Sequence, residues 1–209
     1  MFRWTLPLAR VELDLRRLPS GHGIRRARAR AHANLVVNAG FFDSRGRTLG
    51  LSVAKGRQIT PYSARLGGGV VTVRRGVAEL HSAVGFEAPE DTEFALQAKP
   101  RLVVGGEAVR MHGPQVRADR TALCLRDEGR TIDIVVARSR HPVGHGGPTL
   151  RQFAHTLEDM GCESALNLDG GRSTAAAWTV RGRLRVLPPR DVIRQVIVVR
   201  PRPVIATSG

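Results

Sequence analysis

Short apolar runs separated by glycine-containing turns recur along most of the sequence. Val70 to Val73 and Val77 to Leu80, for example, flank the turn pair Arg75-Gly76, and Thr121 to Arg126 is followed closely by Thr131 to Ala137. Runs of this length, bounded by turn residues, are typical of β-strands joined in hairpins. We expect about ten to twelve short strands, arranged in one or more mixed, largely antiparallel sheets.

One segment carries a strong helical pattern, Thr149 to Met160. Thr149 and Gln152 have the spacing of a capping box, which marks a helix start. Ile24 to Ala33 is a weaker helix candidate, rich in arginine and alanine. One or two helices packed on antiparallel sheets make an α+β fold. The apolar face of the stronger helix holds Leu150, Phe153, Ala154 and Leu157.

The chain has 209 residues, which fits a single domain spanning residues 1–209. Its formal net charge is +15, and all but two of its 33 basic residues are arginines. A positive field favours anionic partners such as phosphates, nucleic acid or acidic glycans. The dense cluster from Arg25 to Arg30 is read either as a solvated helix face or as an arm that binds nucleic acid or a membrane surface. Aromatic residues make up 4% of the chain, fewer than a base-stacking surface usually needs.

Two cysteines, Cys124 and Cys162, are too few for a disulfide framework. Cys124 lies in a strand pattern and is expected to be a buried thiol, while a bridge to Cys162 stays open. No apolar run is long enough to cross a membrane. Met1 to Ala9 is too short and too interrupted for a secretion signal, so the sequence leaves the compartment undecided.

An acidic residue follows one apolar strand pattern near the C-terminal end. Ser164 to Leu168 delivers Asp169 to a sheet edge, where Gly170 and Gly171 allow a sharp turn and a close approach to a ligand. The turn N–H groups and nearby side chains can donate to an anion. The alternative is a tight turn stabilised by an aspartate side chain. The donor side chains are Arg172, Ser173 and Thr174.

A second strand end carries similar chemistry. Leu35 to Val37 runs into Asn38, and Asp43 follows five residues later. Brought together, Asp43 and Asp169 could form an acid/base or nucleophile/acid pair. Asn38 could hold a sugar hydroxyl, and an aromatic face could support a sugar ring. The alternatives are that Asp43 forms a turn and that the aromatic residues belong to the core. Between the two polar residues lie Gly40, Phe41 and Phe42.

These residues resemble the phosphodiester glycosidase family over roughly residues 35 to 200. The run from Asn38 to Asp43 stands where the family has Asn-Gly-Gly-Phe-Phe-Asp. Gly147-Pro148-Thr149-Leu150 matches its helix start, and Leu168 to Ser173 matches Leu-Asp-Gly-Gly-Gly-Ser. Arg172 replaces the third glycine of that motif. Further matches are Arg120-Thr121-Ala122 and Ala137-Arg138.

The resemblance implies hydrolysis of a sugar-1-phosphodiester at its anomeric bond, giving free sugar and a phosphomonoester. Asp169 and Asp43 are then the catalytic candidates, and arginines hold the phosphate. No cofactor is required, although the two aspartates leave Ca²⁺ or Mg²⁺ as a minor alternative. The alternative function is a non-catalytic basic protein that binds nucleic acid or an anionic glycan polymer. The oligomeric state stays open. The expected substrate-binding residues are Asn38, Gly40, Phe41, Phe42, Arg120, Arg138, Gly170, Gly171, Arg172, Ser173 and Thr174.

Overall fold

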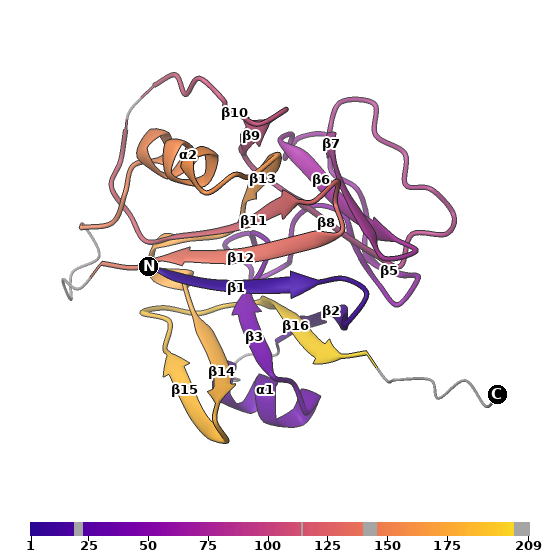
Figure 1. Cartoon of the computed structure of the whole chain (residues 1–209), viewed down its shortest axis with the longest axis vertical. Helices are drawn as coiled ribbons and strands as arrows, with labels where there is room; N and C mark the ends of the chain where they lie inside the picture. The colour runs from indigo at the N-terminus through magenta and orange to yellow at the C-terminus, as the bar shows by residue number, and fades with distance from the viewer. Residues whose placement is uncertain (19–22, 114, 140–145, 203–209) are drawn as a thin grey trace.

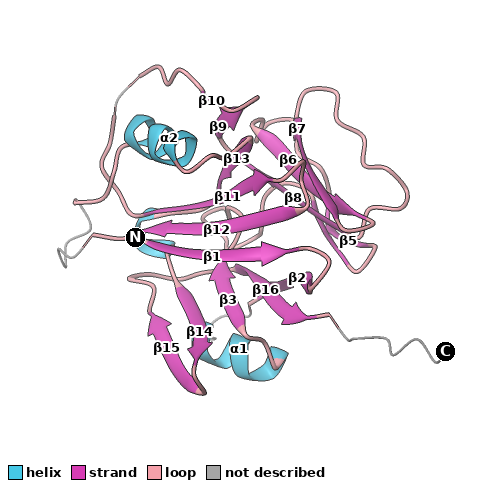
Figure 2. Cartoon of the chain, in the orientation of Figure 1, coloured by secondary structure: helices cyan, strands magenta, loops and turns pink. Residues whose placement is uncertain are grey.

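Three antiparallel sheets and two α-helices form the computed structural model, which describes residues 1–18, 23–113, 115–139 and 146–202 (Figures 1 and 2). The first sheet has the order β1 (Phe2–Pro7), β12 (Thr131–Ala137), β11 (Arg120–Arg126), β13 (Ser164–Asn167), β9 (Arg101–Val104) and β10 (Glu107–Ala108). The second has β15 (Arg183–Leu187), β14 (Ala176–Val180), β3 (Leu35–Asn38), β16 (Gln195–Pro201) and β2 (Val11–Arg17). The third has β5 (Arg57–Thr60), β4 (Ser52–Ala54), β8 (Phe94–Ala98), β6 (Gly69–Arg74) and β7 (Val77–Ser82).

The expected α+β class is confirmed in outline, but the strand count is too low. The described residues contain 16 strands in three sheets, and every strand pairing given for them is antiparallel rather than mixed. Two strands were overlooked, β1 and β8. In β1 the aromatic and aliphatic side chains alternate with exposed ones, but the strand lies at a sheet edge and pairs with β12, more than 120 residues away. In β8 all five residues are buried, so the strand shows no alternation.

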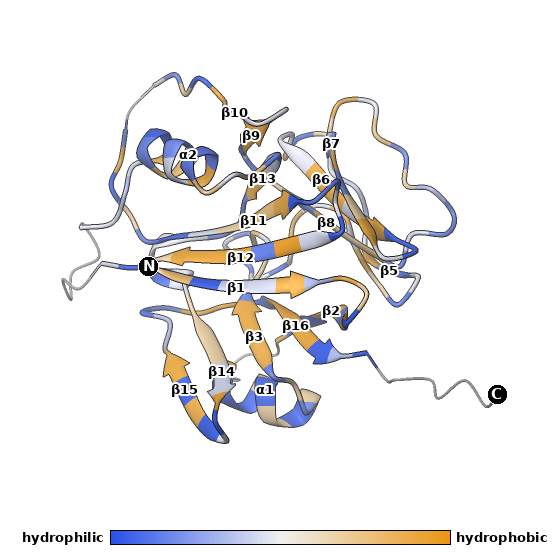
Figure 3. Cartoon of the chain, viewed as in Figure 1, coloured by the Kyte–Doolittle hydropathy of each residue, from blue (hydrophilic) through white to orange (hydrophobic). Residues whose placement is uncertain are grey.

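A single large core lies between the sheets, and each sheet contributes to it. Leu123 comes from the first sheet, Ile197 from the second and Leu96 from the third, and all three are fully buried. Figure 3 shows apolar residues concentrated along the strands, while charged residues gather at the turns and on the helix surfaces. The shared core fixes the three sheets against one another, because apolar surface on each is removed from water by the other two.

The two helices cover outer faces of two different sheets. Helix α2 (Leu150–Asp159) begins with the expected capping box, in which Thr149 and Gln152 exchange hydrogen bonds, and its buried Phe153 packs with Val135 of the first sheet. Helix α1 (Ile24–Ala31) packs Ala27 against Val198 of the second sheet. No helix in the described part of the chain is long and apolar enough to cross a membrane.

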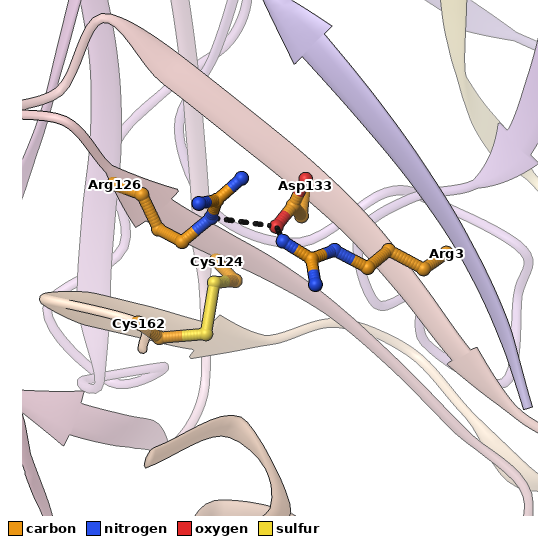
Figure 4. Close-up of a disulfide and its surroundings, with 5 residues drawn as sticks. All are labelled: Arg3, Cys124, Arg126, Asp133 and Cys162. Atoms are coloured by element: carbon orange, nitrogen blue, oxygen red, sulfur yellow. Dashed lines mark hydrogen bonds and ion pairs between the residues drawn. A yellow bond between two sulfur atoms is a disulfide. The ribbon is translucent and has the colours of Figure 1, made fainter. Parts of the chain in front are cut away.

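Cys124 and Cys162 form a disulfide that joins β11 to the turn after α2 (Figure 4). The expectation that Cys124 is a free thiol is therefore wrong, and the bridge that the sequence left open is present. Their Cα atoms lie 5.4 Å apart, although 38 positions separate them in sequence. The disulfide thus ties the layer of α2 to the first sheet. On β12, the strand next to β11, the buried carboxylate of Asp133 accepts hydrogen bonds from the guanidiniums of Arg3 at 2.6 Å and Arg126 at 2.8 Å.

Replacing both bridged cysteines with alanine should lower the free energy of unfolding by about 2–4 kcal/mol, because closing a loop of this length restricts the unfolded chain. Chemical denaturation of the oxidised wild type and the double variant measures the difference. A reducing agent should lower the stability of the wild type and leave the double variant unchanged. Equal stability of the two oxidised proteins would contradict the expectation.

Candidate active site

Strand β3 of the second sheet and strand β13 of the first sheet end side by side. The Asn38 side-chain Nδ2 donates to the backbone oxygen of Asp169 at 2.5 Å, and the Asp169 N–H donates to the Ala39 oxygen at 3.0 Å. The two strand ends that the sequence singled out therefore meet in space. This junction lies where the first and second sheets adjoin.

Asn38 holds the junction together. Its side chain is 1% exposed, and its Oδ1 accepts from the Thr121 hydroxyl at 3.0 Å and from the Ala175 N–H at 3.1 Å. With Nδ2 on Asp169, the amide links strand ends of both sheets. The side chain expected to hold a sugar hydroxyl is thus engaged within the protein.

Asp169 sits on this junction with its carboxyl largely removed from water. Burial raises the pKa of Asp169 to about 6, and hydrogen bonds from the Ser173 side chain and the Gly170 N–H only partly oppose the rise. The Gly170 N–H donates to Oδ1 at 2.9 Å. A carboxyl with this pKa changes protonation near neutral pH, which suits acid–base or nucleophilic chemistry.

The glycines after Asp169 are required by the backbone of the turn Gly171–Ser173, a short 3-10 helix. A Cβ on Gly170 would lie 2.7 Å from the Asp119 oxygen, too close for any other residue. Gly171 has a φ of +57°, a conformation that glycine adopts at little cost, and its N–H donates to the same Asp119 oxygen at 2.7 Å. The turn is therefore pressed against the segment that precedes β11.

Asp43 lies in a turn of its own. Its Oδ1 accepts from the N–H groups of Arg45 and Arg47, each at 2.9 Å, and its Oδ2 pairs with the Arg47 guanidinium at 2.8 Å. The backbone N–H and the side chain of Arg47 hold the pKa of Asp43 below its usual range. Four residues separate Asp43 from Ala39, a span of at most about 14 Å. Asp43 and Asp169 therefore lie at the same end of the molecule.

Two of the three arginines expected to bind phosphate hold backbone carbonyls. Arg120 donates to the oxygens of Pro148 at 3.2 Å and Val116 at 2.5 Å. Arg138 donates to the oxygens of Thr174 at 3.0 Å and Pro188 at 2.5 Å. Burial lowers the pKa of both guanidiniums, which still remain protonated at neutral pH. Both side chains thus fix the loops around Asp169.

Arg172, the third arginine, points outward. Its side chain is 70% exposed and pairs with Asp191 at 3.1 Å and the Arg190 oxygen at 3.2 Å. The cation that replaces a glycine in the family motif therefore lies on the rim of the turn.

Asp119 and Arg190 belong to this site, although the sequence analysis missed both. Asp119 is fully buried, and its Oδ2 pairs with Arg190 at 2.7 Å and Arg138 at 3.6 Å. Its Oδ1 accepts from the Ser139 N–H at 2.7 Å. Asp119 directly precedes the Arg120-Thr121-Ala122 motif, which was the one available signal. Arg190 lies 71 positions after Asp119 in the sequence, and nothing in a single sequence indicates that the two residues are in contact.

The remaining expected ligands lie around the same junction. Phe41 is partly buried against the main core, and Phe42 forms an isolated β-bridge with Thr48. The Gly40 N–H donates to the Gln195 side chain at 3.3 Å, and a Cβ there would approach that oxygen to 2.9 Å. The Ser173 hydroxyl lies 3.2 Å from the Val192 oxygen, so its single proton is shared between that oxygen and the Asp169 carboxyl. The buried Thr174 hydroxyl has no hydrogen-bond partner among the described residues.

The described residues contain no group of three or more histidine, cysteine, aspartate or glutamate side chains that could hold a metal ion. Asp43 and Asp169 lie at the same end of the molecule, but each carboxylate accepts hydrogen bonds within its own turn. The described residues thus bring together one partly buried carboxyl and several guanidiniums, while the N–H groups of Gly170, Gly171, Ser173 and Thr174 are bonded within the protein.

The family model for phosphodiester glycosidases matches residues 31–199. The chain belongs to the phosphodiester glycosidase family. This family assignment covers every element of the junction, from Asn38 to Asp191. No curated protein matches the sequence significantly.

Two of the solved structures that share the fold of this chain illustrate the likeness. One is the catalytic domain of zebrafish N-acetylglucosamine-1-phosphodiester alpha-N-acetylglucosaminidase, auto-inhibited by its pro-peptide, with a TM-score of 0.72 and 18% identity over 94% of this chain and 74% of that chain. The other is a hypothetical protein from Synechocystis, with a TM-score of 0.72 and 17% identity over 96% of this chain and 59% of that chain. At such low identity these likenesses establish the fold alone.

Replacing Asp169 with asparagine should stabilise the fold at alkaline pH. The folded-state pKa of about 6 lies above the ordinary value of 3.8, so the folded state binds this proton more tightly than the unfolded chain does. Ionisation of Asp169 therefore lowers the free energy of unfolding. This loss is absent at about pH 4, where the folded-state carboxyl is protonated, and complete above pH 6 to 7. A pKa difference of about two units corresponds to a loss of about 3 kcal/mol. Urea denaturation at about pH 8 and pH 4 should show an advantage of up to that size at pH 8 only.

Asp159→Asn is the matched control for this measurement, because Asp159 is exposed at the end of α2. It should change stability little at either pH. An effect of Asp169→Asn that is the same at both pH values would contradict the assigned cause.

Replacing Asp119 with asparagine should cost about 3–5 kcal/mol, because two poorly exposed guanidiniums lose their shared carboxylate. In a double-mutant cycle with Arg190→Gln, the combined loss should be clearly smaller than the sum of the single losses. Denaturant unfolding of the four proteins measures the coupling. Strictly additive losses would show that the Asp119–Arg190 pair does not act as a unit.

Proposed function

We propose that this protein hydrolyses the anomeric carbon–oxygen bond of a sugar-1-phosphodiester, releasing free sugar and a phosphomonoester. The observation that carries the proposal is the Asp169 carboxyl, whose pKa burial raises to about 6, within the motif of a phosphodiester glycosidase. Perturbed carboxyls of this kind cluster at active sites, because chemistry near neutral pH needs groups that titrate there.

Ionised Asp169 is the reactive form in this proposal. It either attacks the anomeric carbon or removes a proton from the water that does so. The carbon–oxygen bond breaks with its electron pair passing to the phosphate oxygen. A phosphomonoester has a second pKa of about 6, so it departs with little need for protonation. Water supplies the hydroxyl of the released sugar, and its remaining proton ends on Asp169 or on the departing phosphate.

Positive charge at the departing phosphate is the second requirement. Arg172 suits this role, because its guanidinium is 70% exposed at the rim of the turn that follows Asp169. A guanidinium can bind phosphate oxygens in a bidentate fork. One well-placed donor to developing charge contributes roughly 3–4 kcal/mol to lowering the barrier. Arg120 and Arg138 act here by holding the surrounding loops.

Asp43 is the proposed partner of Asp169. Its low pKa keeps it ionised throughout the range in which Asp169 titrates, so the two carboxyls are electrostatically distinct. Paired carboxyls whose environments push their pKa values apart are typical of a division of roles. Asp43 would orient the sugar or stabilise positive charge that develops on it, while Asp169 acts at the anomeric centre. Gly40, Phe41, Phe42, Gly170, Gly171, Ser173 and Thr174 form the proposed sugar side of the site, and the buried Asn38 positions it.

One observation favours the alternative of a non-catalytic binder of an anionic glycan or nucleic acid. Arg172 stands where the family motif has glycine, and the whole chain carries a net charge of +15. Binding that weakens steeply with salt, without any turnover of sugar-1-phosphodiesters, would support that alternative.

Turnover of a sugar-1-phosphodiester, followed by release of reducing sugar, tests the proposed reaction. Asp169→Asn should lower kcat/KM by at least about 100-fold, and Asp43→Asn should lower it by at least about 10-fold. Because the ionised form of Asp169 reacts, kcat/KM of the wild type should rise through about pH 6 and level off above it. The control Asp159→Asn should retain full turnover. A folded Asp169→Asn protein with wild-type turnover would refute the role of Asp169.

A further inference from the structure

Both tryptophans of the chain lie together, away from the Asp169 turn. Trp4 on β1 and Trp178 on β14 have ring centroids 5.2 Å apart in an edge-on arrangement. Phe2 stacks on Trp4 at 5.9 Å and meets Trp178 at 5.4 Å. All three side chains are partly exposed. They pack against the main core, and the two tryptophans also line an open groove of about 420 Å³.

Arginines of the β14–β15 hairpin lie next to Trp178 on the same face of the sheet. Trp178 pairs directly with Arg185, and Val180 pairs with Arg183. Directly paired residues project from the same face of a sheet, so both arginines lie on the Trp178 side. A second hollow of about 580 Å³ is lined by Val180, Arg181, Arg183 and Arg185. The three arginines are exposed, and no carboxylate occurs in the sequence between Asp169 and Asp191.

The two faces of the β14–β15 hairpin pack against different parts of the protein. Leu187 packs with Trp178 against the main core, whereas the neighbouring Val186 packs with the residues under α1. Figure 1 shows β14 and β15 extending past β1, with α1 beside them. Arg25 and Arg26 are exposed on α1 and so provide a comparable positive charge on the other side of the second sheet.

We propose that the surface made by the tryptophan hollow (Trp4 and Trp178) and the adjacent arginine hollow (Arg181, Arg183 and Arg185) binds a sugar chain that carries phosphodiester groups. Flat aromatic faces can stack on sugar rings, and guanidinium forks bind phosphate oxygens. The groove thus combines the two contacts that a chain of alternating sugar and phosphate requires. We name it the tryptophan–arginine groove.

The groove adjoins the candidate active site through one strand. Thr174 lies beside Asn38 and Arg138 at the site, and β14 runs from there to the hairpin. Four residues of strand separate Thr174 from Trp178, a distance of about 13 Å. In this proposal, a sugar chain bound beside Trp178 extends from there toward Asp169. The choice of a phosphodiester-bearing sugar chain over nucleic acid rests on the proposed function.

Tryptophan fluorescence reports directly on this groove, because the chain has no other tryptophan. The probe is a synthetic oligosaccharide with sugar-1-phosphodiester links, added to the full-length wild type and to Asp169→Asn. We expect a saturable change in emission in both. The double variant Arg183→Glu/Arg185→Glu should weaken binding at least 10-fold. Arg25→Glu/Arg26→Glu changes the net charge equally and should weaken binding less than 3-fold.

Turnover separates the groove from the active site. In Arg183→Glu/Arg185→Glu, kcat/KM for the oligosaccharide should fall at least 10-fold, while turnover of a monomeric sugar-1-phosphodiester should stay within 2-fold of the wild type. Both substitutions lie on the exposed edge strand β15, and thermal unfolding checks that the variant is folded. Saturable binding to a wild type that lacks turnover would overturn the proposed reaction and support the groove.

Three results would overturn the groove proposal. One is an equal loss of binding in the two double variants, which would indicate general electrostatic attraction. Another is equal binding of the same oligosaccharide without phosphate, which would remove the role of the arginines. The third is tighter binding of single-stranded DNA with the same number of charges, which would assign the groove to nucleic acid.

Discussion

The hydrogen bonds of the Asn38 carboxamide are the interaction on which the candidate site depends. One side chain joins the end of β3, the Thr121 hydroxyl on β11 and the backbone on both sides of the Gly171–Ser173 turn. A buried amide with its partners satisfied favours one arrangement, because each unmade bond costs about 1–3 kcal/mol. The ends of strands from two sheets are thereby held in fixed positions around Asp169. The two sheets bring these strand ends close together, and the hydrogen bonds of the Asn38 amide fix their relative positions.

The raised pKa of Asp169 in so basic a protein has a structural cause. A guanidinium within about 4–6 Å of a carboxylate would lower its pKa by stabilising the charged form. Around Asp169, Arg138 and Arg190 instead face Asp119, and Arg120 faces carbonyl oxygens. Among the described residues, no arginine contributes to the pKa shift of Asp169. The buried Asp119 therefore has an electrostatic as well as a structural consequence, since it keeps two cations turned away from the proposed reactive carboxyl.

Local patterns in the sequence predicted most hairpins, both helices and the capping box, because those features depend on residues close in sequence. The strands that escaped notice depend on distant partners: β1 pairs with β12 from the other half of the chain, and β8 is buried on both faces. The disulfide and the Asp119–Arg190 pair escaped for the same reason. Their geometry exists only after the sheets have assembled, and neither spacing nor composition encodes it in a single sequence.

The net positive charge of the chain explains why polyanions are attracted to it, but not which polyanion it binds best. Arg138, Arg190 and Arg200 are partly buried and pair with buried carboxylates, whereas exposed arginines lie on α1, such as Arg25 and Arg26, and on the β14–β15 hairpin. A field from exposed charges is screened within about 8–10 Å in physiological salt and attracts polyanions of many kinds. Discrimination among those polyanions must therefore come from short-range contacts. The partly exposed tryptophan pair and the partly buried Asp169 are two features that act at that range. Trp178 is held in β14, and the segment that leads from the Asp169 turn enters the same strand at Ala176, so the scaffold that carries the one also carries the other.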